Sequence, residues 1–171
     1  NPENRCPCLL LLDTSGSMAG EKIQNLNDGI QAFANALQAD SMASKRVRVA
    51  MVSFGPVEEV QPFMDVDEFS PITLTAQGAA PMGEAILKAI ELVEAEKQRY
   101  RDSGISYCRP WIYMISDGAV TDDITAARAA IQEGEVGRKF WFKAVGVEGA
   151  DMDTLKSLTH KIPPVSLKGL A

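Results

Sequence analysis

The most restrictive feature of the sequence is a run of five apolar residues, 8–12, that leads directly into the polar segment Asp13-Thr14-Ser15-Gly16-Ser17. An uninterrupted apolar run of this length is typical of a parallel strand that helices cover on both faces. The chain then becomes helical in pattern, because apolar residues recur at spacings of three and four: Ile23, Leu26, Ile30, Phe33 and Leu37. The sequence therefore predicts a buried strand, a polar loop and an amphipathic helix.

The same alternation continues along the chain and predicts the fold. We expect buried strands over residues 47–54, 111–116 and 140–147, helices over 81–101, 121–135 and 153–159, and a short last strand around 165–167. Residues 57–64 contain Pro62, which has no N–H to donate to a neighbouring strand and therefore does not suit a central strand. This segment is predicted to be an antiparallel edge strand. The expected fold class is α/β: a Rossmann-like, doubly wound, mostly parallel sheet with helices on both faces, formed by residues 1–171 as one domain.

Composition and charge restrict the possible partners. The apolar share of 46% and the charged share of 23% are those of a globular protein, and there is no apolar run of membrane-spanning length. The net charge of -6 argues against binding to nucleic acid or to an anionic membrane, since both require a positive field. A partner that is cationic, or that is bridged by a metal ion, is therefore expected.

The cysteines indicate a reducing environment. Their number is odd, and Cys6 and Cys8 are only two residues apart, so we expect buried thiols and no disulfide framework. A zinc site is not expected either, because Cys108 stands alone and there is no second Cys-x-x-Cys pair. The chain does not open with a basic and then apolar leader, and a cytoplasmic location is predicted.

Two polar loops that follow predicted strands contain aspartate. Asp13 follows the first strand, and Asp117 lies in Ser116-Asp117-Gly118 after the strand over 111–116. Ligands of doubly wound sheets collect at the carboxyl ends of strands where the strand order reverses, so the two carboxylates are expected to face each other. Together with hydroxyls they form a hard oxygen set that suits Mg²⁺ or Mn²⁺ better than Zn²⁺. The alternative is a turn that only caps the next helix.

Three segments resemble the metal-ion-dependent adhesion site of von Willebrand factor type A domains: DTSGSM at 13–18, APMGEAI at 80–86 and ISDG at 115–118. The resemblance implies that Mg²⁺ or Mn²⁺ is surrounded by Asp13, Ser15, Ser17 and Asp117, and that an acidic side chain of a protein partner completes its coordination. The family has threonine where this chain has Ala80, whose methyl group cannot ligate a metal. Metal binding is therefore expected to be weak or to depend on the partner.

Within that family, the first segment, the PMGEAI segment and residues 163–170 are similar to bacterial tellurium-resistance-associated (TerY-like) proteins. This similarity implies a cytoplasmic adaptor in a stress-response system, and it implies that the family usually continues with a final helix past the last residue of this sequence.

Two other functions fit these residues less well. A flavodoxin-like phosphate or nucleotide binder also has a Ser/Thr/Gly loop before a helix, but Asp13 and Asp117 would repel the anion. An aspartate-dependent phosphotransferase would need a second aspartate in place of Ser15, and His160 has no nucleophile motif to serve. Thr121, Asp122 and Asp123 are expected to cap the following helix rather than to widen the site. The prediction is a non-catalytic, protein-binding domain.

Overall fold

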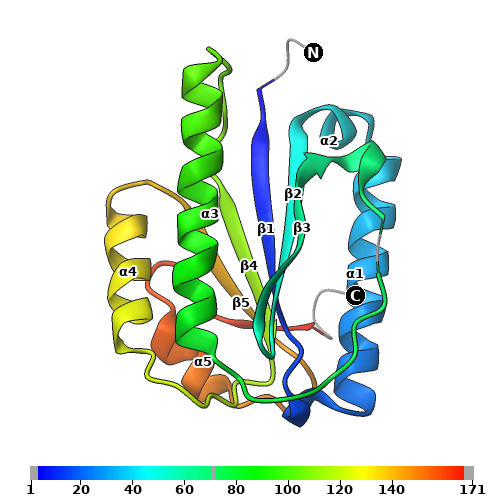
Figure 1. The fold of residues 1–171 in the computed structure, drawn as a ribbon, viewed down its shortest axis with the longest axis vertical. Coiled ribbons are helices and arrows are strands. Elements are labelled where there is room, and N and C mark those ends of the chain that lie inside the picture. The colour runs from blue at the N-terminus through cyan, green and yellow to red at the C-terminus, as the bar shows by residue number, and fades with distance from the viewer. Residues whose placement is uncertain (1–3, 71, 168–171) are drawn as a thin grey trace.

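The structure is a computed structural model that describes residues 4–70 and 72–167 (Figure 1). Its centre is a six-stranded sheet in the order β3-β2-β1-β4-β5-β6. The strands are β1 (Cys6–Asp13), β2 (Val47–Phe54), β3 (Val57–Asp65), β4 (Trp111–Ser116), β5 (Trp141–Gly146) and β6 (Val165–Ser166). All neighbouring strands are parallel except β2 and β3. The predicted doubly wound sheet with one antiparallel edge strand is confirmed.

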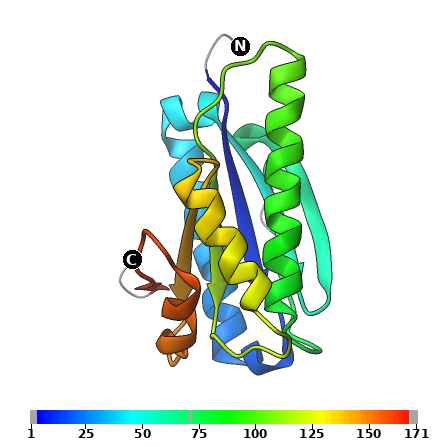
Figure 2. The same cartoon turned by 90° about the vertical axis from the view of Figure 1, so that its left-hand side faces the viewer.

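Helices cover both faces of the sheet. The helices are α1 (Glu21–Ala39), α2 (Ser41–Arg46), α3 (Met82–Asp102), α4 (Thr125–Val136) and α5 (Met152–Leu158), with short 3-10 turns η1 (Gly16–Met18) and η2 (Val66–Glu68). One apolar cluster joins the sheet to α3, α4 and α5, and the other joins it to α1. Helices α3 and α4 lie side by side (Figure 2). Among the described residues, no helix is long and apolar enough to cross a membrane.

The continuous apolar character of β1 follows from its central position. Leu9 and Leu11 belong to the cluster under α3, whereas Leu10 and Leu12 belong to the cluster under α1. All four side chains are buried, because successive residues of a strand point to opposite faces and both faces are covered here.

Pro62 lies on the edge strand, as predicted, and at an irregularity of the ladder. Met51 of β2 is opposite Gln61 of β3, but Val49 is opposite Met64, so β3 has one more residue than β2 in this interval. A bulge on an edge strand tolerates the missing N–H of proline.

Two helical segments differ from the prediction. Helix α2 was not predicted; its first turn is capped by the side chain of Asp40, which accepts hydrogen bonds from the N–H groups of Met42 and Ala43. Helix α4 begins at Thr125 rather than at residue 121, because Thr121 and Asp122 bind the start of α3 instead. Residues 168–170 of the terminal segment that resembles the tellurium-resistance-associated proteins lie outside the described residues.

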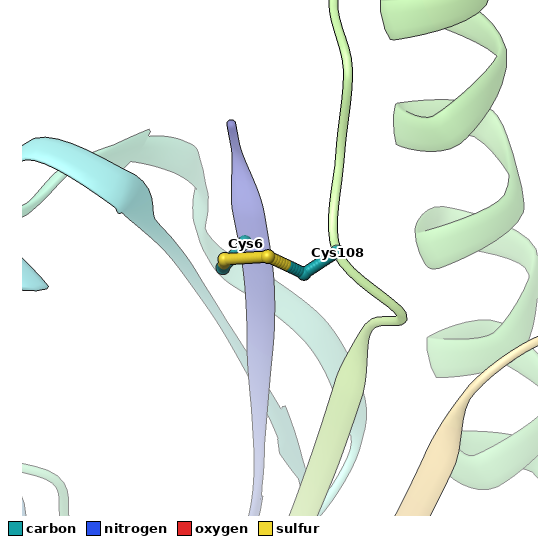
Figure 3. Close-up of a disulfide and its surroundings, with 2 residues drawn as sticks. All are labelled: Cys6 and Cys108. Atoms are coloured by element: carbon teal, nitrogen blue, oxygen red, sulfur yellow. A yellow bond between two sulfur atoms is a disulfide. The ribbon is translucent and has the colours of Figure 1, made fainter. Parts of the chain in front are cut away.

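The prediction that the chain has no disulfide is wrong. Cys6 and Cys108 are joined by a disulfide between the start of β1 and the segment before β4 (Figure 3). The cross-link arises because Arg5 and Tyr107 pair in parallel just beyond the two strands, which brings together residues 102 positions apart. Cys8 is a free buried thiol, as expected, and burial raises its pKa to about 12. The cysteines therefore no longer support a reducing compartment.

Candidate metal-binding site

The two aspartates of the predicted site meet at one edge of the sheet. Asp13 is the last residue of β1, and Asp117 directly follows β4. Strands β1 and β4 are parallel neighbours, so their carboxyl ends lie together, at the lower end of the sheet in Figure 1. Because β1 pairs with β2 on its other side, this edge is the switch point of the sheet, where a ligand site is expected.

Asp13 is fully buried and accepts three hydrogen bonds. Its Oδ1 atom accepts from the backbone N–H of Ser15 at 3.0 Å and from the Ser15 hydroxyl at 2.6 Å. Its Oδ2 atom accepts from the hydroxyl of Ser116 at 2.7 Å. Burial raises the pKa of the Asp13 carboxyl, and these hydrogen bonds lower it only in part. The charge of Asp117 raises it further, so the site destabilises the ionised form of Asp13.

Asp117 is also buried, but the groups around it stabilise its charge more strongly than those around Asp13. Burial alone would raise its pKa, but hydrogen bonds from the Ser17 hydroxyl, the Ala119 N–H and the Lys22 ammonium lower it below its ordinary value. The Ala119 nitrogen lies 3.0 Å from Oδ1, and the Lys22 Nζ atom lies 3.3 Å from Oδ2. The surroundings therefore favour the ionised form of Asp117 more than that of Asp13.

The two serines connect the aspartates. The hydroxyl oxygens of Ser15 and Ser17 are 3.1 Å apart and the Ser15 hydroxyl donates to Asp13. Ser17 also lies near Asp117, whose pKa it lowers, so the four side chains form one polar cluster. Ser15 is buried, whereas Ser17 is exposed and marks the open side of the site. The structure thus brings together all four residues predicted from the sequence.

The loop that carries the serines is held by neighbouring backbone. The N–H of Gly16 donates to the carbonyl of Gly78 at 2.9 Å, and the N–H of Gln77 donates to the carbonyl of Thr14 at 2.7 Å. Gly55 packs so closely that a Cβ atom there would lie 2.8 Å from the Thr14 carbonyl carbon. These contacts with residues 77–78 and with Gly55 hold the loop in place.

The segment that precedes α3 is attached to the Asp117 loop. The N–H of Ala80 donates to the Thr121 hydroxyl at 2.9 Å, and the N–H of Thr121 donates to the Ala80 carbonyl at 3.0 Å. Asp122 accepts from the N–H groups of Gly83 and Glu84, both at 3.0 Å. The expectation that Asp122 caps the following helix is wrong, because it caps α3; only Asp123 binds the start of α4, through the N–H of Thr125 at 2.9 Å.

Replacing Asp122 by alanine is expected to lower the free energy of unfolding by about 1 kcal/mol, the usual cost of a lost helix cap. The reason is that the residue before α3, Pro81, offers no side-chain cap of its own. Urea denaturation would measure the change. Asp122→Asn keeps one acceptor oxygen and should lose less; equal stability of wild type and both variants would contradict the capping role.

The donor set fits a hard divalent cation. Two carboxylates and two hydroxyls converge, and the Lys22 ammonium already shows that this edge attracts positive charge. No group of three or more His, Cys, Asp or Glu side chains that could hold a metal occurs among the described residues. An ion here would depend on hydroxyl and water oxygens, which Mg²⁺ and Mn²⁺ accept and Zn²⁺ does not favour.

Two residues of the site were not predicted from the sequence. Ser116 orients the Asp13 carboxylate, and its own oxygen accepts from the N–H of Gly118 at 2.9 Å. Lys22 pairs with Asp117 from the first turn of α1. A lysine in this position is unfavourable for the helix dipole, and this unusual placement was the signal that could have identified it.

Comparisons with known proteins agree with this fold. The model of the von Willebrand factor type A domain matches residues 9–164. A search of curated sequences finds no match. Among solved structures, the chain is similar to the pilus adhesin SpaC from Lactobacillus rhamnosus GG, with 12% identity, a TM-score of 0.76 and coverage of 97% of this chain and 28% of that one.

Two further solved structures have the same fold. One is the vWF domain of the type V pili tip protein Mfa5 from Porphyromonas gingivalis, with 11% identity, a TM-score of 0.70 and coverage of 98% of this chain and 91% of that one. The other is manganese-loaded TRAP protein from Plasmodium vivax, with 14% identity, a TM-score of 0.58 and coverage of 98% and 70%. At these identities the likeness concerns the fold alone.

Proposed function

Because this chain belongs to the von Willebrand factor type A family, we propose that it is a non-catalytic protein-binding domain that engages its partner through a divalent cation held beside Asp13. The observation that carries the proposal is the clustering of the polar side chains of Asp13, Ser15, Ser17 and Asp117 at the switch point of the sheet. Domains of this family commonly mediate contacts between proteins, as the adhesins with this fold illustrate.

The proposed ion is Mg²⁺ or Mn²⁺. Asp13, Ser15, Ser17 and Asp117 would hold it, directly or through water, and a bound ion would supply a positive centre that accepts a carboxylate. An acidic side chain of the partner is the ligand we propose, because a protein with a net charge of -6 needs a cation to attract a carboxylate. The solved TRAP structure with this fold is manganese-loaded, which supports the choice of ion.

Replacing Ala80 by threonine is expected to tighten Mn²⁺ binding about tenfold, equivalent to about 1.4 kcal/mol. Ala80 is buried and precedes α3, in the segment bound to the Asp117 loop through Thr121, and the family pattern has a threonine ligand at this position. A hydroxyl there would add the oxygen that the family pattern has. Calorimetric titration would measure the change.

The matched control is Ala80→Val, which has the shape of threonine without its hydroxyl. It should leave the Mn²⁺ dissociation constant unchanged or raise it. Equal affinities for the threonine and valine variants would contradict a role of this position in metal binding.

The biological setting is proposed from sequence resemblance alone. We propose an adaptor in a bacterial tellurite or stress-resistance system, on the likeness of the DTSGSM and PMGEAI segments to those proteins. A cytoplasmic location remains a prediction, and the Cys6–Cys108 disulfide counts against it, since such bonds persist in oxidising compartments.

A second candidate function is phosphate or nucleotide binding by the same loop. Asp13 and Asp117 oppose it, because two buried carboxylates repel an anion, and the ammonium nearest to them, that of Lys22, is paired with Asp117. Titration of the protein with Mn²⁺ and, separately, with metal-free inorganic phosphate and ATP distinguishes the two functions. The metal proposal requires a response to Mn²⁺; phosphate or ATP binding without any metal response would reject it.

A further inference from the structure

Lys22 occupies a position that its own helix does not favour. It lies in the first turn of α1, where the positive end of the helix dipole opposes a cation. Its Nζ atom nevertheless lies 3.3 Å from Oδ2 of Asp117. The side chain of Asp117 is 2% exposed and that of Lys22 is 34% exposed, so the ammonium contacts the buried carboxylate from the solvent side. Lys22 is therefore a positive charge placed directly against the buried Asp117 carboxylate.

We propose that Lys22 is a tethered cation that neutralises Asp117 in the metal-free protein and is displaced when a divalent ion binds, so that Lys22 sets the metal affinity of the site. This inference rests on the proposed function, because it assumes that the ion binds beside Asp117. Both cations need the same carboxylate, and two positive charges this close repel each other. The ion must therefore compete with the ammonium.

The surface beside Lys22 offers the displaced ammonium a second position. A cavity of about 230 Å³ is lined by Ala19, Glu21, Lys22, Asn25 and Glu148. The carboxylates of Glu21 and Glu148 give this cavity a negative character. A lysine side chain has four methylene groups with rotatable bonds and carries a compact charge. The ammonium can therefore leave Asp117 and pair with these carboxylates while the helix stays in place.

Calorimetric titration with Mn²⁺ tests the competition. Lys22→Met keeps an unbranched side chain, removes the charge and is expected to lower the dissociation constant about tenfold. Lys22→Arg retains the cation and should bind Mn²⁺ with an affinity near that of wild type. The matched control is Lys45→Met, which makes the same change on exposed α2, beyond the other end of α1, and should have no effect. An unchanged or higher dissociation constant for Lys22→Met would overturn the proposal.

Displacement itself has a separate readout. The NMR signals of the Lys22 ε-methylene and ammonium groups should shift on addition of diamagnetic Mg²⁺, and Glu148→Gln should reduce this shift. Signals of Lys22 that do not move while Mg²⁺ binds would overturn the proposal even if affinities changed.

The outcomes separate this inference from the proposed function. If wild type and Lys22→Met bind Mn²⁺ equally well and Asp13→Asn abolishes binding in both, the metal site stands and the tethered cation is wrong. If neither protein binds Mn²⁺, both proposals are wrong.

Discussion

Replacing Asp13 by asparagine is expected to abolish binding of Mn²⁺ and to raise the thermal stability of the metal-free protein. The loss should exceed about 100-fold, because even residues that only orient a metal ligand cost 10- to 100-fold. Asparagine retains the size of the side chain and can still accept from Ser15, so the loop is expected to keep its shape. Calorimetric titration measures the first effect and thermal unfolding in chelator measures the second.

The rise in stability follows from the pKa of Asp13. Burial raises this pKa in the folded state, so the protonated carboxyl stabilises the fold below the unfolded-state pKa, and this contribution is lost as the pH rises through the folded-state pKa. Above the folded-state pKa the carboxylate is ionised at a cost, which a neutral asparagine avoids. The metal-free Asp13→Asn variant should therefore melt a few degrees higher than wild type at pH 7, and the difference should shrink toward pH 4. Retained metal binding or a lower melting temperature would contradict this account of the site.

Removing the Cys6–Cys108 disulfide is expected to have the largest effect on stability. The bond links residues 102 positions apart, and constraining an unfolded chain over a loop of that length contributes on the order of 3 to 5 kcal/mol. The double variant Cys6→Ser/Cys108→Ser should lose this amount in urea denaturation. Serine suits both positions, because neither cysteine is buried in the core.

The same variant also tests whether the disulfide and the metal site are independent. Cys6 begins β1 and Asp13 ends it, about 20 Å away at 3.3 Å per residue. The variant should therefore keep the Mn²⁺ dissociation constant of wild type at temperatures where it is folded. Reductant should destabilise wild type and leave the variant unchanged. The protein can be taken directly from its native cells and denatured, and its reactive thiols counted. One reactive thiol is expected, and three would contradict the disulfide.

The sequence was most informative where a pattern follows from local geometry. The apolar run of β1 could be predicted because both faces of a central strand are buried, and Pro62 identified the edge because it cannot donate to a ladder. The convergence of Asp13 and Asp117 could be predicted as well, since parallel strands end at the same edge of a sheet.

Features that depend on register or on contacts between distant segments could not be predicted. The disulfide requires that Arg5 and Tyr107 pair, which fixes Cys6 beside Cys108, and no local pattern specifies that register. Asp122 lies just before a predicted helix, where an aspartate commonly caps that helix, but the fold places it against the start of α3.

The ion pair of Lys22 also depends on a contact between distant segments. Its pairing with Asp117 joins residues 95 positions apart, and it becomes visible only once α1 and the loop after β4 are placed together. In the sequence, only the unfavourable position of a cation in the first turn of a helix indicated a role for Lys22. That position does not identify Asp117 as the residue with which Lys22 pairs.

The most direct test of the central claim is an affinity capture from the native cells, with the domain as bait, performed in Mg²⁺ and again in chelator. Asp13→Asn in Mg²⁺ provides the control for effects of the ion elsewhere in the extract. Metal-bridged binding predicts a protein partner that is retained in Mg²⁺ and lost both in chelator and with Asp13→Asn, and whose retention depends on one of its own acidic side chains. The same set of partners under all three conditions would contradict it.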